Sequence, residues 1–244
     1  MKPWQNIPIR DNQEELVSIP ENLNFVTPHP YFKLGAPYSN KKNFWNLREG
    51  VLSRLLKANK YLRSNYRDYY FLIYDSWRPL EVQEYMFYYA CHNECKKKGI
   101  KFSRKKINSL PEIVNKVEKF WAFPSPSINN PPPHSTGAAL DITLVDKFGK
   151  SLDMGCEIDQ MDDSASPDYF KKGINQQEKD CHYRRKILQE TMLKYDFAQH
   201  PNEWWHFSYG DQLWSWLSKK GNAIYGATLE VSNDITLSEP SLVT

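Results

Sequence analysis

The sequence predicts a single domain of mixed α and β structure. Apolar residues recur at near-helical spacing over residues 49–65, whereas residues 68–74 and 139–144 carry the β-branched, aromatic and alternating apolar residues of strands. A chain of 244 residues with 40% hydrophobic content is long enough to bury its own core. We therefore expect one domain over residues 1–244, with a loosely attached polar tail from about residue 227.

The charge balance argues against nucleic acid as the main partner. There are 32 Lys and Arg against 29 Asp and Glu, a formal net charge of +3, which is too small for broad phosphate neutralisation. No stretch approaches the roughly 18 consecutive apolar residues of a membrane span, and the first residues lack the apolar region of a secretory signal. We expect a protein without nucleic-acid or membrane partners, located in the cytoplasm.

The four cysteines are predicted to be free thiols. Cys91, Cys95, Cys156 and Cys181 are sparse in a chain of this length and contain no C-x-x-C pair, which argues against a disulfide framework or a zinc finger. Cys91 and Cys95 stand one helical turn apart beside His92, but ordinary helix packing explains them better than a metal site does. The 15 Tyr, 12 Phe and 8 Trp predict an aromatic-rich core.

The first third of the chain is predicted to run from loops into a helix and a buried strand. Residues 1–45 are rich in Pro and Asn and predict loops with an edge strand. The helix over 49–65 precedes the strand over 68–74. That strand gives way to another helix at Arg78, because the residue before a proline favours extended geometry and Pro79 suits a first helical turn. The Arg78 side chain therefore sits on a rigid corner.

The helix that begins at Pro79 is expected to end near Gly99, after lysines that suit its C-terminal dipole. The basic stretch over 96–106 is typical of solvated helix ends and loops rather than of nucleic-acid binding. A second amphipathic helix is predicted over 111–120. Residues 123–133 contain five prolines and can form neither helix nor central strand, so they make a stiff surface approach to the next segment.

The segment from His134 to Leu144 is predicted to be a strand with two different faces. The Leu and Ile side chains of residues 140–144 share the core face, while Asp141 shares the other with small Ala and Thr neighbours. Those neighbours leave space around the carboxylate, as a ligand sphere requires. Gly137 allows the chain to turn, so that His134 can fold back towards Asp141.

A long polar segment follows this strand. Residues 146–180 are loop-like, and an irregular segment of that length inside a domain is often a lid or binding loop. The apolar spacing then predicts a helix over 182–197. No internal repeat is evident.

Residues 203–209 are predicted to form a last aromatic strand. In a regular strand, positions three apart face opposite sides, so Glu203 and His206 can reach one metal only if the strand is distorted. We therefore expect a bulge or bend at Trp204-Trp205.

Five side chains in this sequence form a plausible hydrolytic centre. His134, Asp141 and His206 supply two imidazoles and a carboxylate, a sufficient set for a catalytic zinc that keeps its fourth position for water. Glu203 fits the base that takes a proton from that water and passes it to a leaving amine. Arg78 can stabilise the developing oxyanion, and losing one such donor typically costs ~3 kcal/mol.

Each of these residues alone also has a structural interpretation. A histidine after prolines is usually a surface residue, a strand-end aspartate is usually a cap, and an arginine before proline is usually part of a structural salt bridge. It is the combination that favours a metallohydrolase.

The combination resembles the zinc D,D-dipeptidase and D,D-carboxypeptidase group, specifically the D-alanyl-D-alanine dipeptidases of the vancomycin-resistance type. That family shows a His-x-x-Gly-x-Ala-x-Asp element, met here at residues 134–141, and a late Glu-x-x-His element, met at residues 203–206. An Arg-Pro pair after a strand is met by Arg78 and Pro79. The resemblance covers roughly residues 20–225.

The resemblance implies specific roles for the five residues. His134, Asp141 and His206 would bind one zinc ion per chain, Glu203 would be the catalytic base and acid, and Arg78 would stabilise the transition state. The implied fold is α+β and hedgehog/D,D-peptidase-like, with helices packed on a small central antiparallel sheet that carries the zinc site.

The implied substrate is the free dipeptide D-alanyl-D-alanine, hydrolysed to two D-alanines, so the expected partner is a small dipeptide. A D,D- or L,D-carboxypeptidase acting on cell-wall peptides is the close alternative, and a cytoplasmic location favours the free dipeptide. Pro132 stands where many members carry a serine two residues before the first ligand, which bears on the exact dipeptide preference. The oligomeric state stays open.

Two rival classes share part of this pattern. Two histidines and a carboxylate also describe the facial triad of non-haem iron oxygenases, but the spacing of His134 and Asp141 and the presence of Glu203 and Arg78 argue against it. A non-catalytic zinc-binding module of the same fold is the other alternative, and it would leave Glu203 and Arg78 without a purpose.

Overall fold

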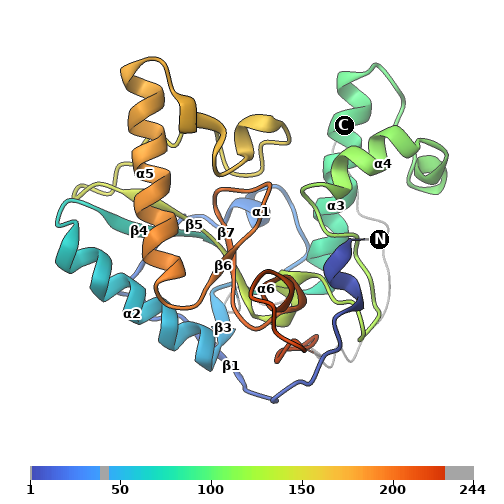
Figure 1. Ribbon diagram of the computed structural model, residues 1–244. Helices are drawn as coiled ribbons and strands as arrows, with labels where there is room; N and C mark the ends of the chain where they lie inside the picture. The colour runs from blue at the N-terminus through green and yellow to red at the C-terminus, as the bar shows by residue number, and fades with distance from the viewer. Residues whose placement is uncertain (1, 39–43, 229–244) are drawn as a thin grey trace.

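The fold is α+β, as the sequence predicts. The computed structural model describes residues 2–38 and 44–228, and its centre is a five-stranded sheet in the order β2-β4-β5-β7-β6 (Figure 1). The strands are β2 (Asn24–Phe25), β4 (Tyr70–Asp75), β5 (Ala139–Val145), β7 (His206–Ser208) and β6 (Ala198–Gln199). All neighbours pair antiparallel except the short edge strand β2, which is parallel to β4.

Helices and a small second sheet surround these strands. Strand β1 (Leu16–Ser18) pairs antiparallel with β3 (Asn46–Arg48). The α-helices are α1 (Pro30–Lys33), α2 (Glu49–Asn65), α3 (Leu80–Lys97), α4 (Pro111–Glu118), α5 (Gln176–Leu193) and α6 (Gln212–Leu217). Short 3-10 helices are η1 (Pro3–Asn6), η3 (Arg104–Ser109), η4 (Pro133–Thr136), η5 (Asp163–Ala165) and η6 (Tyr169–Lys172).

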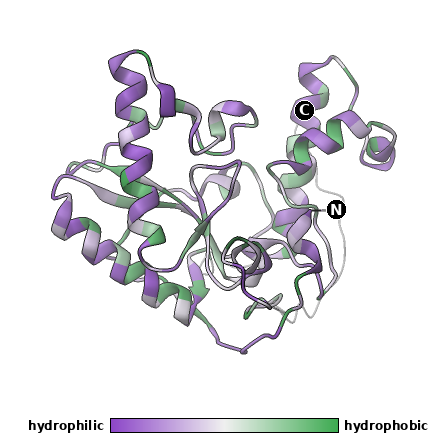
Figure 2. Cartoon of the chain, viewed as in Figure 1, coloured by the Kyte–Doolittle hydropathy of each residue, from purple (hydrophilic) through white to green (hydrophobic). Residues whose placement is uncertain are grey.

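Helix α2 has the bounds that its apolar spacing predicts. Val51, Leu55 and Leu62 recur on one face and are fully buried, and Figure 2 shows the resulting bands of hydrophobic and hydrophilic residues along the helix. Full burial of each leucine side chain contributes about 2 kcal/mol to folding. Packing of this face therefore fixes one side of the main core.

Strand β5 is the centre of the sheet and is buried along its whole length. Leu140, Ile142 and Leu144 point into the main core, as expected from their alternation, and pack in one cluster with residues of β4 and β7. Trp204 and Trp205 are among the largest buried side chains of that cluster, which agrees with the aromatic-rich core that composition predicts.

A second, smaller core lies in the lobe formed by α3 and α4, which Figure 1 shows beyond the end of β4, apart from α2 and α5. Val82 and Met86 of α3 pack there against Ile113 and Val117 of α4. All four cysteines are free thiols, and Cys91 is packed inside this lobe.

Helix α5 begins earlier than the apolar spacing predicts, at Gln176 rather than near residue 182. The Asn175 side chain caps the helix by accepting a hydrogen bond from the Glu178 backbone N–H at 2.9 Å. The first turns of α5 are polar and partly exposed, so no apolar periodicity marks them. The segment that precedes α5 is irregular apart from η5 and η6, as expected.

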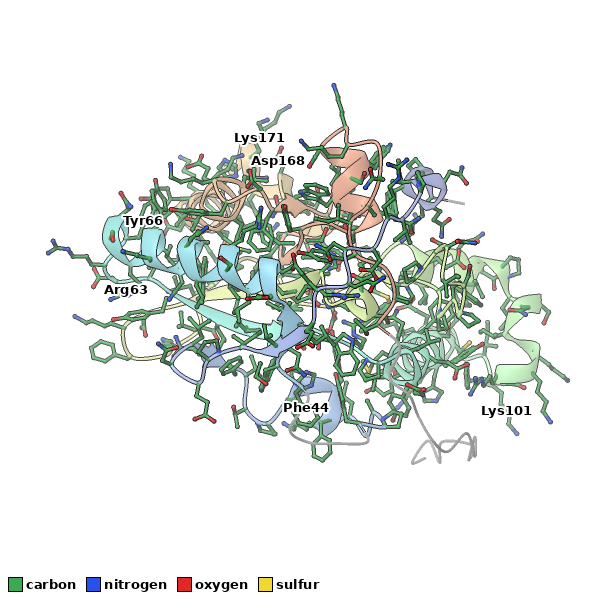
Figure 3. All side chains as sticks on the ribbon, turned by 90° about the horizontal axis from the view of Figure 1, so that it is seen from below. Phe44, Arg63, Tyr66, Lys101, Asp168 and Lys171 are labelled. Atoms are coloured by element: carbon green, nitrogen blue, oxygen red, sulfur yellow. The ribbon has the colours of Figure 1, made fainter. Side chains whose placement is uncertain are left out.

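The basic residues are spread over the surface. Figure 3 shows Arg63, Lys101 and Lys171 at widely separated edges of the molecule, each directed outwards. Lys96 and Lys97 lie in the last turn of α3, where a positive charge interacts favourably with the helix dipole. None of the helices in the described ranges combines the length and hydropathy that a bilayer crossing requires.

The predicted C-terminal tail lies mostly outside the described residues. Thr228, near its beginning, is tied to the body of the protein, because its backbone N–H donates to the Ser135 carbonyl at 3.1 Å and its hydroxyl accepts from the Trp77 indole at 2.6 Å. The chain is thus still attached at residue 228, one residue beyond the expected start of the tail.

Candidate metal and catalytic site

A glycine turn places the first candidate ligand next to the second. His134 lies in η4, the chain then turns at Gly137, and Asp141 follows in β5. Gly137 has a φ of +71°, and a Cβ atom on it would lie 2.3 Å from Cδ2 of Leu16. Only glycine fits this turn without strain, and the turn lets His134 fold back onto the strand, as the sequence predicts.

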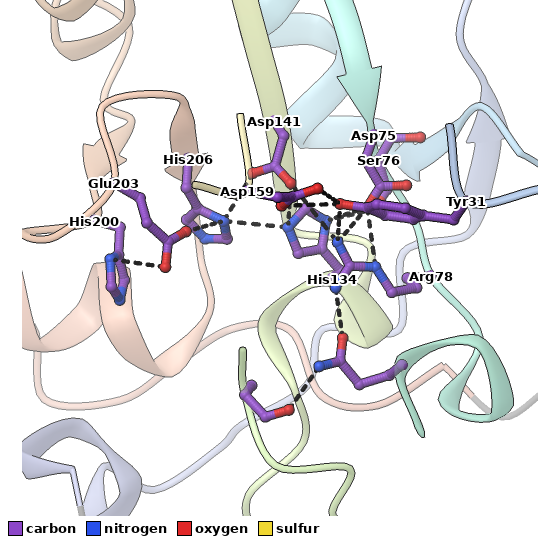
Figure 4. Close-up of polar contacts among 12 residues, drawn as sticks. Tyr31, Asp75, Ser76, Arg78, His134, Asp141, Asp159, His200, Glu203 and His206 are labelled. Atoms are coloured by element: carbon purple, nitrogen blue, oxygen red, sulfur yellow. Dashed lines mark hydrogen bonds and ion pairs between the residues drawn. The ribbon is translucent and has the colours of Figure 1, made fainter. Parts of the chain in front are cut away.

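The structure brings His134, Asp141 and His206 together. Strands β5 and β7 pair Asp141 directly opposite His206. His134 Nε2 lies 3.3 Å from one carboxylate oxygen of Asp141 and 3.2 Å from His206 Nδ1, while His206 Nδ1 lies 3.1 Å from the other oxygen (Figure 4). All three residues are buried, and among the described residues they form a group whose donor atoms all lie within 4.8 Å of one another.

The chemistry of these donor atoms fits a divalent metal. His134 Nδ1 lies 2.7 Å from the Ser76 carbonyl, which can only accept, so Nδ1 carries a proton and Nε2 is the ring nitrogen that can offer a lone pair to a metal. That lone pair faces His206 Nδ1 and the Asp141 carboxylate. Burial alone would raise the pKa of Asp141, but His134 and His206 outweigh it and hold the pKa well below its usual range. Two imidazoles and an ionised carboxylate that converge in this way are typical zinc ligands.

Glu203 reaches the same centre from a turn rather than from a strand. The distortion expected at Trp204-Trp205 is present as a turn, but the strand expected over residues 203–209 is wrong at its beginning, because β7 starts only at His206. The two tryptophan side chains that follow Glu203 are buried in the core, and the Trp205 carbonyl still accepts from the Ile142 backbone N–H of β5 at 3.0 Å, so the chain leaves the sheet just before Trp205. Glu203 Oε2 thereby lies 3.8 Å from His206 Nδ1, although the two residues are only three positions apart.

The Glu203 carboxyl is buried and lies next to His200. Its Oε1 is 3.4 Å from His200 Nδ1, and the residue is 5% exposed. Burial, and then the negative charge of Asp141, raise the pKa of Glu203 to about 8. Burial lowers the pKa of His200 well below its ordinary value, so His200 is a neutral neighbour at physiological pH.

Arg78 lies on the corner between β4 and α3, as predicted, and is buried against the site. Its guanidinium donates from Nε and Nη2 to Asp75, from Nη1 to Gln83 at 2.7 Å and from Nη2 to the Tyr31 hydroxyl at 3.3 Å. Nη2 also lies 3.7 Å from Asp141. Burial works against the charged form, but Asp75 outweighs it and raises the pKa of Arg78.

Asp75 is a member of the site that sequence reasoning did not find. Its buried carboxylate accepts hydrogen bonds from Arg78 Nη2 at 2.6 Å and from His29 Nε2 at 3.1 Å, and it lies 3.3 Å from His134 Nδ1. A register shift at the end of β4, between Ile73 and Asp75, turns it towards these partners. The sequence offered one indication of this role, because an aspartate three residues before Arg78 is close enough to pair with its guanidinium.

Asp159 is a second residue that sequence reasoning missed, although it lies in the segment predicted to be a binding loop. Its carboxylate accepts a hydrogen bond of 3.0 Å from the Tyr31 hydroxyl. Desolvation, and then the charge of Asp141, raise the pKa of Asp159 to about 8. Figure 4 shows Tyr31, to which Asp159 is hydrogen-bonded, on one side of His134 and His206, and Glu203 and His200 on the other.

These side chains open into one pocket with a volume of about 330 Å³. His134, Asp141 and His206 lie at its base with Glu203, Arg78 and Asp159, so all five residues singled out from the sequence line it. Its other walls come from α3 and α4, the proline-rich approach over residues 130–133, and the N-terminal residues Lys2, Trp4 and Gln5.

Two comparisons with known proteins place the sequence in a family. A family described as D-ala-D-ala dipeptidase, peptidase M15, matches residues 41–222. A D-alanyl-D-alanine dipeptidase from Synechocystis sp. is 38% identical over 223 residues, covering 88% of this chain and 90% of that protein.

Two solved structures are more distant. The vancomycin-resistance D,D-pentapeptidase VanY from a VanB-type cassette, in complex with Zn(II), has a TM-score of 0.48 and 15% identity over 90% of this chain and 96% of its own. The LD-carboxypeptidase LdcB has a TM-score of 0.44 and 17% identity over 90% and 84%. The assignment of the chain to a family therefore rests on the two sequence matches.

Proposed function

Since this chain belongs to the D-Ala-D-Ala dipeptidase family, a family of zinc metallopeptidases, we propose that it hydrolyses D-alanyl-D-alanine to two D-alanines with one zinc ion per chain. The observation that carries this proposal is the convergence of two imidazoles, a carboxylate, a buried glutamate and a buried arginine on one pocket.

His134 Nε2, His206 Nδ1 and the Asp141 carboxylate are the proposed zinc ligands. Zinc in such a site polarises a scissile carbonyl and lowers the pKa of a coordinated water towards ~7. The Ser76 carbonyl supports the site by fixing the tautomer and ring orientation of His134.

Glu203 is the proposed general base and acid. A carboxyl group whose pKa lies near neutrality can take a proton from the attacking water and return it to the leaving amine nitrogen. The turn at residues 203–205 and the contact with His200 hold Glu203 beside His206. Its burial keeps bulk water from competing for the proton.

Arg78 is the proposed stabiliser of the oxyanion that develops on the scissile carbonyl. Four of its five N–H donors are used by Asp75, Gln83 and Tyr31 among the described residues. These contacts hold the guanidinium rigid beside Asp141, and a preorganised cation stabilises developing charge without a cost of reorientation.

The pocket also suits a short peptide with a free amino end. A volume of about 330 Å³ is at the small end of the range for ligand sites. Asp159 provides a desolvated carboxyl beyond Arg78, and an ammonium group placed against it would restore its ionised form. An N-acetylated substrate would lack that ammonium group.

The test is a panel of L,L, L,D and D,D dipeptides and N-acetyl-D-Ala-D-Ala, assayed for alanine release with and without a metal chelator. We expect release from D-Ala-D-Ala that chelation abolishes and zinc restores. Preference for the acetylated substrate or for longer wall peptides would instead indicate a carboxypeptidase. Zinc binding without hydrolysis of any substrate would indicate a binding module.

A further inference from the structure

The N-terminal segment forms one wall of the catalytic pocket. Figure 1 shows it running beside α6 and the α3–α4 lobe. The Gln212 side-chain amide fixes it there, because Nε2 donates to the Ile7 carbonyl at 2.7 Å and to the Asn129 carbonyl at 3.0 Å. Residues of this segment therefore have a defined position relative to the reacting groups, although no sequence pattern connects them with the site.

Trp4 anchors the wall, and Lys2 is held beside it. The Trp4 ring contacts His200 edge-on at 6.0 Å between centroids and packs on Trp216 at 5.6 Å. The Lys2 backbone N–H donates to the Gln5 side chain at 2.7 Å, and its ammonium lies 5.4 Å from the centre of the Trp4 ring. Lys2, Trp4 and Gln5 all line the pocket.

The Lys2 ammonium group is not engaged in a hydrogen bond or an ion pair with the described residues, 2–38 and 44–228. Partial burial lowers its pKa, and the charges of Glu203 and Glu118 favour its protonated form. It therefore has three N–H donors available to a ligand in the pocket.

The direction of the proposed reaction places a substrate anion near this cation. The carboxylate of a dipeptide is two bonds from the leaving nitrogen, which receives its proton from Glu203. It must therefore lie on the Glu203 side of the metal ligands, away from Asp159. The other fixed cation of the pocket, Arg78, lies on the Asp159 side and uses four of its five donors within the protein.

We propose that Lys2 is a specificity-determining residue that binds the free C-terminal carboxylate of the dipeptide. This inference rests on the proposed function, because it takes the position of the carboxylate from the role of Glu203. Lys2 at one end and Asp159 at the other give the pocket the charge pattern of a dipeptide zwitterion, which neutral or blocked peptides lack.

The test removes each partner of the proposed ion pair in turn, the cation from the enzyme and the carboxylate from the substrate. Lys2→Met removes the cation and keeps the apolar stem, and D-alanyl-D-alaninamide removes the substrate carboxylate. We expect Lys2→Met to raise KM for D-Ala-D-Ala about tenfold with kcat within about twofold, because a charged hydrogen bond made equally in the ground and transition states is lost. With the amide substrate, wild type and Lys2→Met should give equal values.

Two controls separate this role from a structural one. Lys2→Arg retains the charge and should restore KM to within about threefold of wild type, and Lys57→Met, on an exposed part of α2, should change nothing. An equal effect of Lys2→Met on both substrates, or no effect on either, would overturn the proposal. Equal loss on both substrates would indicate that Lys2 acts through the wall or through Glu203.

A binding measurement keeps the two proposals distinguishable. If the wild type releases no alanine, the proposed function fails, and calorimetry with D-Ala-D-Ala and its amide on the zinc-loaded protein then tests Lys2 directly. Weaker binding of the dipeptide, but not of its amide, to Lys2→Met would support the carboxylate contact. Identical binding by both proteins, or no binding of the dipeptide to either, would reject it.

Discussion

Glu203 and Asp141 show how the same fold gives neighbouring carboxyl groups opposite properties. Both are buried, and burial by itself raises the pKa of each. Asp141 lies between two imidazoles, which hold its pKa low. Glu203 lies beside a neutral His200, and the negative charge of Asp141 raises its pKa further. One group is therefore suited to bind a metal and the other to transfer a proton.

Glu203→Gln tests the proton-transfer role. The amide keeps the volume and the contact with His200 but cannot accept the proton of the attacking water, so kcat should fall about 10³-fold. Zinc content should stay at one per chain because the three ligands are untouched. Activity near that of the wild type would remove Glu203 from the mechanism, and loss of zinc would make it a ligand.

Asp159→Asn tests the desolvated carboxyl through the pH dependence of stability. The folded protein holds the proton of Asp159 up to a pKa of about 8, above the ordinary value of 3.8, so this residue stabilises the fold below pH 4 and loses that contribution as pH rises through 8. Asn mimics the protonated form and tolerates the positive φ of 66°.

We therefore expect Asp159→Asn to be as stable as wild type at pH 4 and about 5 kcal/mol more stable at pH 8 in the substrate-free protein, because the pKa shift from 3.8 to about 8 is worth about 1.4 kcal/mol per pH unit. Denaturant unfolding at both pH values measures the difference. A constant difference across this range, or a loss of stability at pH 8, would show that the carboxyl is not desolvated.

At the level of elements, the segment from η4 into β5 positions the centre, and its geometry was largely predictable. A single turn and a single strand connect His134 to Asp141, so spacing within the sequence determines their distance. The turn before β7 was not predictable in form. The strand period shows that Glu203 and His206 would face opposite sides of a regular strand, so a distortion between them is predictable. Its form depends on how the two buried tryptophans between them pack, which the period does not give.

Gly137→Ala tests the turn against a matched control. Gly149 has a similar φ of +79° but no atoms within 4 Å of an added Cβ, whereas Gly137 would meet Leu16. Gly149→Ala should therefore cost only the backbone strain, about 1 kcal/mol, and Gly137→Ala about 1–3 kcal/mol with weaker zinc binding. Thermal unfolding and zinc titration measure both effects, and equal behaviour of the two variants would mean that the close approach at Gly137 is unimportant.

At the level of the whole molecule, the pocket is assembled from segments far apart in the sequence. Of the proposed metal ligands, Asp141 and His206 belong to the central sheet and His134 to η4, just before β5. Arg78 belongs to the junction with the α3–α4 lobe, and Asp159 and Lys2 belong to irregular segments 157 residues apart. Irregular segments have no periodicity from which their spatial neighbours can be inferred. This is why sequence reasoning found the residues of motifs and strands but missed Asp159 and Lys2.

The ends of the described chain also meet near the site. Thr228 bonds to Ser135, the residue after His134, while the N-terminal segment pairs with Ala223 through Pro8 and Arg10. The bonds of Thr228 to Ser135 thus tie the C-terminal part of the described chain to the helix η4 that carries His134. The cytoplasmic location expected from the sequence stays a prediction.

Zinc-edge anomalous diffraction from crystals of the zinc-loaded protein tests the central claim most directly. We predict one anomalous peak per chain, about 2.0–2.2 Å from His134 Nε2, His206 Nδ1 and an Asp141 oxygen, with Glu203 beside it and not coordinated. A peak held by other residues, or the absence of a peak among these three side chains at full zinc content, would contradict the account.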